Sequence, residues 1–192
     1  MNYKELLEKE IEQIKKIPIQ RVSNLVSQIS RYIGHGRIIT SGMGKAGQIA
    51  HTFATTLSST GTPAFFLHPS EAQHGDLGIV QPGDVIIVFS NSGKTREVLE
   101  LIDLVHNLEY SNYIFAIVGT KSDDISIKCA DYIEFGLVEE ICPLGLTPTT
   151  STTCMSVISD LIVVGLMDKN NFTKKEYSKL HHGGYLGDKS RN

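Results

Sequence analysis

The sequence contains no tryptophan and only three cysteines, Cys129, Cys142 and Cys154. The cysteines are odd in number and show no C-x-x-C spacing. They therefore predict neither a disulfide framework nor a zinc site built from cysteines. The sequence also has no basic run and carries a formal net charge of -3, which argues against a surface that binds nucleic acid.

Long hydrophobic runs are also missing. The first ten residues are charged and amphipathic, without the apolar core of a signal peptide. The longest apolar run, near residues 158–167, is interrupted by Asp160 and is shorter than the roughly 20 residues that a membrane-spanning helix needs. We therefore expect a cytoplasmic protein that forms a single domain over residues 1–192, long enough for a full core.

Helical and strand patterns alternate along most of the chain. Amphipathic spacing predicts two helices within residues 1–35. Strands alternate with helices over residues 36–170, with an irregular segment at 70–78, and residues 171–192 are expected to form a last helix and a histidine-containing polar tail. Alternation of this kind predicts an α/β protein, a three-layer α-β-α sandwich around a five-stranded parallel sheet in the flavodoxin-like order 2-1-3-4-5.

Two turns of this predicted sheet are typical of phosphate binding. One strand leads into Ser90-Asn91-Ser92-Gly93-Lys94-Thr95 and another into Ser41-Gly42-Met43-Gly44-Lys45, and a helix follows each turn. Free backbone N–H groups and the positive end of the helix dipole converge at such turns. Because Ser, Thr and Asn also cap ordinary helices, one such turn alone is weak evidence. A second turn of the same kind strengthens the interpretation as a phosphate-binding site. The expected binding residues of the two turns are Ser41, Gly42, Gly44, Ser90, Asn91, Ser92 and Thr95.

The order of the strands predicts that both turns serve one ligand. In the 2-1-3-4-5 order the first and third strands are neighbours whose connections leave in opposite directions, and such folds bind ligands at that point. We therefore expect a phosphorylated small molecule between residues 41–45 and 90–95. Gly42, Gly44 and Gly47 also spell the G-x-G-x-x-G of dinucleotide-binding folds. The next strand ends in His68 rather than the required acid, so we expect no nicotinamide or flavin.

Titratable side chains occur near the predicted crevice. Glu97 lies in the first turn of a helix and Glu140 in a loop on the carboxyl side of the sheet. His74 and His181 lie in polar, glycine-containing segments, and Lys45 lies within a turn. Each alone has an ordinary explanation, such as an acid favoured by the helix dipole. Together, carboxylates, imidazoles and an ammonium group around a phosphate cradle suit proton transfer beside a carbonyl.

Five motifs follow one another along nearly the whole chain. They are Ser41-Gly42-Met43-Gly44-Lys45, the segment 68–78 that reads HPSEAQHGDLG, Ser90-Asn91-Ser92-Gly93, the segment 142–149 that reads CPLGLTPT, and a closing H-x-G-G-x-L-G. In this order they resemble the sugar isomerase (SIS) domain of arabinose-5-phosphate isomerases. That family interconverts D-ribulose 5-phosphate and D-arabinose 5-phosphate, the precursor of Kdo (3-deoxy-D-manno-octulosonate) in lipopolysaccharide or capsule. The resemblance implies the same aldose–ketose isomerisation through a cis-enediol.

The resemblance also implies roles for individual residues. Lys45, Glu97, Glu140 and His181 fall on catalytically important positions, and Gly61, Thr62, His68 and His74 fall on positions of the substrate pocket. His68 also falls on a position at which zinc has been associated with the family, although the chemistry requires no cofactor. The family is tetrameric, and its final histidine reaches the site of a neighbouring subunit, so the resemblance implies a homotetramer.

These roles fit the proton transfer inferred from the residues. Glu97 or Glu140 would move the carbon-bound proton, and His181 or His74 would carry out acid–base or ring-opening work. Lys45 would stabilise the negative charge of the enediolate.

The chain departs from the family pattern in three respects. Typical members continue into a pair of CBS (cystathionine-β-synthase-type) modules, which are not expected here because this sequence stops at Asn192. Lys94 stands where the usual loop carries an acid, and His182 replaces a proline next to His181. We expect both changes to affect substrate preference and turnover. Feedback by the activated sugar CMP-Kdo would have to act at the crevice, where Lys45 and Lys94 suit an acidic ligand.

Two alternatives stay open. One is a non-catalytic SIS module that senses a phosphosugar or CMP-Kdo and controls a partner. The acids and histidines argue against it, because binding a phosphate requires none of them. The other is an isomerase or etherase that acts on another sugar phosphate, such as a hexose phosphate.

Overall fold

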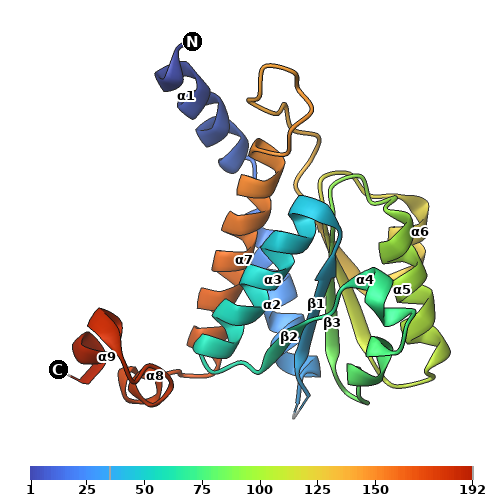
Figure 1. Cartoon of the computed structure of the whole chain (residues 1–192), viewed down its shortest axis with the longest axis vertical. Helices are drawn as coiled ribbons and strands as arrows, with labels where there is room; N and C mark the ends of the chain where they lie inside the picture. Colours follow the sequence, from blue (N-terminus) through green and yellow to red (C-terminus); the bar gives the residue numbers. More distant parts are fainter. Residues whose placement is uncertain (35, 192) are drawn as a thin grey trace.

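A five-stranded parallel sheet lies at the centre of the computed structural model, which describes residues 1–34 and 36–191 (Figure 1). The strands are β1 (Ile38–Gly42), β2 (Ala64–Phe66), β3 (Val85–Ser90), β4 (Tyr113–Val118) and β5 (Asp131–Glu134). Their order is β2-β1-β3-β4-β5, and every neighbouring pair is parallel. The predicted fold class and strand order are therefore confirmed.

Helices cover both faces of the sheet and make it the middle of three layers (Figure 1). One face carries α2 (Ile19–Tyr32), α3 (Gly44–Ser59) and α7 (Thr150–Lys169). The other face carries α4 (Pro69–Ala72), α5 (Arg96–Asn107) and α6 (Asp123–Lys128). Strand β3 shows how the two cores form, because Val85, Ile87 and Phe89 pack on the first face while Ile86 and Val88 pack on the second. A strand buried on both faces reads as one continuous apolar run.

Two segments are more ordered than the sequence predicts. The expected irregular stretch contains α4 and a 3-10 turn, η1 (Asp76–Ile79). Pro69 stands in the first turn of α4, where its fixed φ favours a helix start. The expected polar tail contains a ninth helix, α9 (Gly184–Arg191), which follows α8 (Lys174–Leu180). Gly187 lies against the carbonyl oxygen of His181, so that a side chain at this position would collide with the preceding turn.

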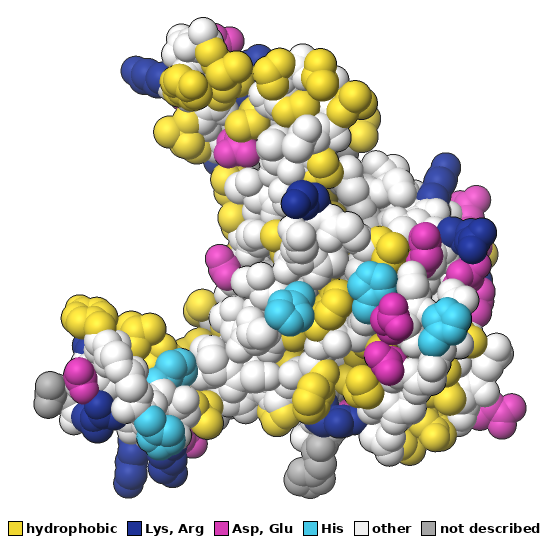
Figure 2. Space-filling view, in the orientation of Figure 1, with side chains coloured by type: hydrophobic (Ala, Val, Ile, Leu, Met, Phe, Trp, Pro, Cys, Tyr) yellow, Lys and Arg dark blue, Asp and Glu magenta, His cyan; other side chains and the backbone are white. Residues whose placement is uncertain are grey.

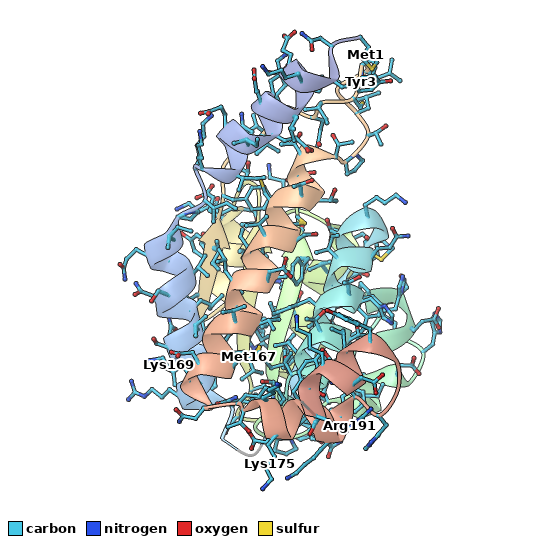
Figure 3. All side chains as sticks on the ribbon, turned by 90° about the vertical axis from the view of Figure 1, so that its left-hand side faces the viewer. Met1, Tyr3, Met167, Lys169, Lys175 and Arg191 are labelled. Carbon is cyan, nitrogen blue, oxygen red and sulfur yellow. The ribbon has the colours of Figure 1, made fainter. Side chains whose placement is uncertain are left out.

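The two ends of the chain extend from opposite ends of α7. Figure 3 shows Met1 and Tyr3 at one end and Lys169, Lys175 and Arg191 at the other. Helix α1 (Tyr3–Ile14) buries none of its residues completely. Hydrophobic side chains gather over α1 and over the C-terminal helices (Figure 2). The large exposed apolar residues of these segments are Tyr3, Leu7, Ile11, Leu180, Tyr185 and Leu186.

Helix α7 is long and apolar enough, by length and composition alone, to cross a membrane. It runs from Thr150 to Lys169, has 20 residues and contains the apolar run near residues 158–167. Cys154, Met155, Ile158 and Ile162 of this helix are buried in the core on the sheet. We therefore interpret α7 as the central helix of its layer.

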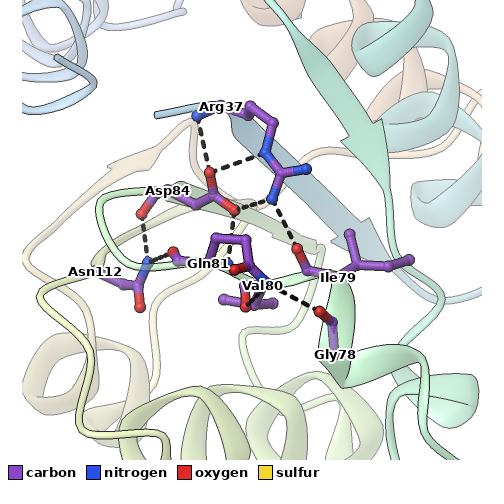
Figure 4. Close-up of polar contacts among 7 residues, drawn as sticks. All are labelled: Arg37, Gly78, Ile79, Val80, Gln81, Asp84 and Asn112. Carbon is purple, nitrogen blue, oxygen red and sulfur yellow. Dashed lines mark hydrogen bonds and ion pairs between the residues drawn. The ribbon is translucent and has the colours of Figure 1, made fainter. Parts of the chain in front are cut away.

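A polar network joins the amino ends of β1 and β3 (Figure 4). The carboxylate of Asp84 accepts hydrogen bonds from the Arg37 backbone N–H at 2.9 Å, from Arg37 Nη2 at 2.7 Å and from the Gln81 N–H at 2.9 Å. Arg37 Nη2 also donates to the carbonyl oxygen of Ile79 at 2.8 Å. Asn112 donates to the Asp84 carbonyl oxygen at 2.9 Å. The network fixes the end of the sheet that lies away from the two predicted phosphate turns.

Candidate active site

The two phosphate-type turns face one cavity. Strands β1 and β3 are paired up to Gly42 and Phe89, so both turns leave the same edge of the sheet side by side. Between them and the start of α7 lies a cavity of about 240 Å³, which we call the cradle cavity. Its lining residues are Met43, Lys45, Ala46, Ser90, Asn91, Ser92, Thr95, Pro148, Ser151, Thr152 and Met155.

The loop from Ser90 to Thr95 is held in a fixed shape beside this cavity. The hydroxyl oxygens of Ser90 and Thr95 are 2.8 Å apart and share a hydrogen bond. Gly93 has a positive φ of 65°, and a Cβ atom there would stand 2.5 Å from the carbonyl oxygen of Thr120. Only glycine tolerates both restrictions. Asn91 and Ser92 are exposed, and helix α5 begins directly after the loop. An anion in this position would meet the positive end of the α5 dipole.

The other turn divides its residues between two cavities. Lys45 lines the cradle cavity, and its ammonium group lies 3.3 Å from the side-chain oxygen of Gln48. Gly42 and Gly44 line a second cavity of about 550 Å³ on the β2 side. The Ser41 side chain is completely buried, and its hydroxyl donates to the carbonyl oxygen of Leu67 at 2.6 Å. The Ser41 hydroxyl therefore holds the end of the β2 strand and does not line the cradle cavity.

Two imidazoles lie in the second cavity. His51 and His68 both contact the ring of Phe66 edge to face, with centroids 5.4 Å and 6.3 Å away. His51 belongs to none of the sequence motifs, but it follows Gly47 by one turn of α3, and helical spacing could have placed it beside the glycine turn. Within residues 1–34 and 36–191, no three His, Cys, Asp or Glu side chains are grouped to hold a metal ion. Because protein zinc sites use three or four such ligands, a zinc ion at His68 would need further ligands from outside the described residues.

Glu140 is held as an ionised carboxylate at the start of α7. Its Oε2 atom accepts from the Thr149 N–H at 2.7 Å, the Thr149 hydroxyl at 3.0 Å and the Ser151 N–H at 3.2 Å. Burial opposes ionisation, but the donors of Ser151 and Thr149 outweigh it and lower the pKa of Glu140. No hydrogen bond reaches Oε1 from any residue that the structure describes. Glu140 therefore has one oxygen fixed and one oxygen available to accept a proton.

Ser151 connects Glu140 with the cradle cavity. Glu140 itself lines a neighbouring groove of about 490 Å³ between α1 and the loop 139–143. The Ser151 N–H binds Glu140, while the same residue lines the cradle cavity. Ser151 thus lies between the Glu140 carboxylate and the phosphate-type loop.

The structure does not bring Glu97 or His74 into the cradle cavity. Glu97 is half-buried in the first turn of α5, and its side chain is not among the lining residues. His74 is exposed after α4. The adjacent Gln73 donates to Glu100 at 2.7 Å and so ties this segment to α5.

Three other predicted residues lie at the opposite end of the molecule. Gly61 and Thr62 follow the last turn of α3, and Gly61 lies against the ring of Phe172 at the base of the C-terminal helices. His181 follows α8. Helix α7 runs between Glu140 and these residues, and its 20 residues span about 30 Å at 1.5 Å per residue. Within one chain, His181 is therefore remote from the cradle cavity.

The ring of His181 is nevertheless fixed. It stacks on the ring of Tyr177, with centroids 3.7 Å apart and planes inclined by 5°. Its Nδ1 lies 3.0 Å from the carbonyl oxygen of Tyr177. A carbonyl oxygen only accepts hydrogen bonds, so Nδ1 carries the proton and donates it. Nε2 of the neutral imidazole is then free to accept a proton.

Cys142 is placed close to this site by its loop. Its Sγ atom accepts from the backbone N–H groups of Thr147 and Leu146, each at 3.2 Å. These donors lower the pKa of Cys142 to about 7. Burial raises the pKa of Cys129 to about 12 and contributes most to raising that of Cys154 to about 11.

We expect iodoacetamide to alkylate Cys142 much faster than the other two cysteines, because the thiolate is the reactive form. The rate at Cys142 should reach half its maximum near pH 7. Mass spectrometry of peptides after timed labelling measures each site separately, and Cys142→Ser is the control. Equal labelling of all three cysteines in the folded protein would contradict the hydrogen bonding of this loop.

Comparison with known proteins finds a family model that covers most of the chain. The profile of the family described as SIS domain matches residues 32–164. Arabinose 5-phosphate isomerase KdsD of Yersinia pestis is 42% identical over 156 residues, which are 81% of this chain and 47% of that protein. The chain thus spans about half the length of the curated relatives that it matches.

Two solved structures have the same fold over nearly their whole length. A Bacteroides fragilis protein, assigned as a phosphosugar isomerase involved in capsule formation, gives a TM-score of 0.91 at 49% identity and covers 95% of this chain and 97% of its own. The protein c3406 of E. coli CFT073, in complex with arabinose 5-phosphate, gives a TM-score of 0.85 at 32% identity and covers 93% of this chain and 95% of its own.

Proposed function

The chain belongs to the SIS domain family, and from this premise we propose that it interconverts D-ribulose 5-phosphate and D-arabinose 5-phosphate. The observation that carries the proposal is the cradle cavity, with a phosphate-type loop on one wall and the ionised Glu140 behind Ser151 on the other. The relatives named arabinose 5-phosphate isomerase, and the arabinose 5-phosphate bound to the E. coli protein, support this substrate.

In this proposal the phosphoryl group binds at the start of α5. The hydroxyls of Ser90, Ser92 and Thr95 and the backbone N–H groups of the loop would hold its oxygens. Lys45 on the facing wall adds a positive charge. The sugar chain then extends across the cavity toward α7.

Glu140 is the proposed base for the carbon-bound proton. Its free Oε1 would remove a proton from the carbon next to the carbonyl, and the electron pair would form the cis-enediol. The protonated carboxyl group would then exchange its proton with water and deliver a proton to the neighbouring carbon, while an acid–base group moves the oxygen-bound proton. Lys45 would stabilise the negative charge that develops on oxygen. Neither of the two candidate carboxylates lines the cradle cavity, but Glu140 accepts a hydrogen bond from the backbone N–H of Ser151, a residue of the cavity wall, and the geometry therefore favours Glu140.

We assign the acid–base role on oxygen to His181 of a neighbouring subunit. His181, Gly61 and Thr62 share the end of the molecule that lies away from the cradle cavity of their own chain. Exposed apolar residues on α1 and on the C-terminal helices offer surface for contacts between copies. A homotetramer in which this end of one subunit reaches the cradle of another would complete the site.

Tyr177 should matter for turnover if His181 acts in this way. Replacing Tyr177 by Leu removes the stacked ring that holds the imidazole plane, and we expect kcat to fall about tenfold, because general acid–base catalysis depends on alignment. Tyr177→Phe keeps the ring and should stay within twofold of the wild-type kcat. KM should change little in either variant. Equal effects of Leu and Phe would contradict the positioning role.

The proposed reaction is tested by incubating the purified protein with ribulose 5-phosphate. NMR should show arabinose 5-phosphate forming, and in D₂O one deuterium should appear on the carbon next to the new aldehyde. Binding without any conversion would favour the non-catalytic sensing module. Conversion of a hexose phosphate only would favour the other isomerases.

The biological setting is part of the same proposal. The product would enter Kdo biosynthesis for lipopolysaccharide or capsule in the cytoplasm. CMP-Kdo, as a feedback ligand, would compete with the sugar phosphate at the cradle cavity, near Lys45 and the exposed Lys94. Competition assays with CMP-Kdo address this point separately from turnover.

A further inference from the structure

Two hydroxyl groups are buried without partners at the start of α7. Thr150 is completely buried and Ser151 is 1% exposed. No group stands at both the distance and the angle of a hydrogen bond to Thr150 Oγ1 or Ser151 Oγ among the residues that the structure describes, although the Ser151 hydroxyl lies close enough to the Glu140 carboxylate to help lower the pKa of Glu140. A buried hydroxyl without a partner destabilises the folded protein. Such a group is therefore a candidate for binding a ligand atom.

Only one of the two lies at the cradle cavity. Ser151 is part of the cavity wall, together with Ser90, Asn91 and Ser92 of the phosphate-type loop, whereas Thr150 is not. The Ser151 backbone N–H donates to Oε2 of Glu140 at 3.2 Å. Ser151 thus occupies the position between the phosphate-type loop and the proposed base.

The charges around Ser151 decide what kind of atom it binds. The N–H groups of Thr149 and Ser151 at the start of α7 already donate to the carboxylate of Glu140. A phosphoryl group at this end of the cavity would meet that negative charge. The start of α5 and Lys45 offer positive potential at the cavity, and the acid in the first turn of α5, Glu97, does not line it. An uncharged oxygen is therefore the better partner for Ser151.

We propose that the Ser151 hydroxyl binds a hydroxyl or carbonyl oxygen of the sugar chain. This contact orients the substrate, with the phosphoryl group at the start of α5 and the reacting carbons toward Glu140. The inference rests on the proposed function and adds a residue that determines how the substrate lies.

The experiment compares Ser151→Ala with Thr150→Val as the matched control. Both variants remove a buried hydroxyl that has no partner, so both should unfold at a temperature equal to or higher than the wild type. Ser151→Ala should lower kcat/KM for arabinose 5-phosphate about tenfold, the usual effect of one lost hydrogen bond. Inhibition by inorganic phosphate should be unchanged. Thr150→Val should stay within twofold of the wild type in all kinetic constants.

The outcomes separate this inference from the proposed function. If the wild type neither binds nor isomerises the pentose phosphates, both are overturned. If the wild type is active and Ser151→Ala has the same kcat/KM, only the inference is overturned. An equal weakening of inorganic phosphate and arabinose 5-phosphate also overturns it, because Ser151 would then contact the phosphoryl group. A selective loss for the sugar phosphate, together with unchanged or raised thermal stability, supports it.

Discussion

Replacing Glu140 by Gln is expected to reduce kcat by about 10³-fold, within the range for loss of a general base. Gln has nearly the same shape, and its amide oxygen can still accept from the Thr149 N–H and hydroxyl, which bind Oε2 of Glu140 at 2.7 Å and 3.0 Å. The amide nitrogen cannot take a proton from carbon. The affinity for inorganic phosphate should stay within twofold, because the phosphate-type loop lies on another wall of the cavity.

Glu139→Gln and Glu97→Gln are the matched controls for this variant. Glu139 is exposed and lines the same groove as Glu140, so its substitution should leave kcat within twofold. Glu97→Gln neutralises the second carboxylate that the sequence offers as a candidate base. Steady-state kinetics in both directions measures the three variants. A loss at Glu97 as large as that expected at Glu140 would move the role of base to Glu97.

The lowered pKa of Glu140 predicts that the effect of Glu140→Gln on stability depends on pH. Because the folded-state pKa lies below the ordinary value, the carboxylate stabilises the fold above the ordinary glutamate pKa. That contribution is lost as the pH falls through the folded-state pKa. Glu140→Gln should therefore lower stability at neutral pH, and the difference from the wild type should shrink in acid.

The fold could be predicted because its signals are local. Residues 85–89 form one apolar run, and both faces of that strand are buried in the structure. The two phosphate-type turns each follow a strand and precede a helix. Once the strands are parallel, such turns must leave the same edge of the sheet. That the two phosphate-type turns lie side by side follows from these facts alone.

The wall of the cradle cavity that the start of α7 forms could not be predicted in the same way. Ser151 comes after an irregular loop at 136–149 that has no periodicity. The packing of α7 on α2 and α3 brings its first turn to the two phosphate-type turns. The direction of the Ser41 side chain was equally hidden, because all of β1 is buried and its pattern has no exposed face.

The remote position of His181 could have been predicted. A helix of 20 residues that begins at the carboxyl edge of a parallel sheet travels about 30 Å. Its end must then lie at the opposite edge, together with everything that follows directly. The length of α7 alone therefore separates His181 from Glu140 within one chain. The resemblance to a tetrameric family explains how His181 could still act, namely at the site of a neighbouring subunit.

Replacing Asp84 by Ala is expected to lower the free energy of unfolding by about 3–5 kcal/mol, the usual effect of removing one partner of a buried ion pair. The Asp84 side chain is 2% exposed and that of Arg37 is 29% exposed. Without the carboxylate, the Arg37 guanidinium and the backbone N–H groups of Arg37 and Gln81 lose their acceptor. Urea denaturation measures the loss, which should lower Tm by about 6–20 °C for a chain of this size.

Asp103→Ala is the matched control for Asp84→Ala, because it also removes an aspartate that pairs with a basic side chain. Asp103 pairs with Lys128 at the surface, with its side chain 52% exposed, and exposed pairs contribute about 0–1 kcal/mol. Asp84 lies at the amino end of β3, whereas the cradle cavity lies at the carboxyl end. Folded Asp84→Ala protein should therefore keep its kcat/KM below its unfolding transition. A similar loss of stability in both variants would mean that burial of Asp84 adds nothing, and the structural role of the network at the amino ends of β1 and β3 would be wrong.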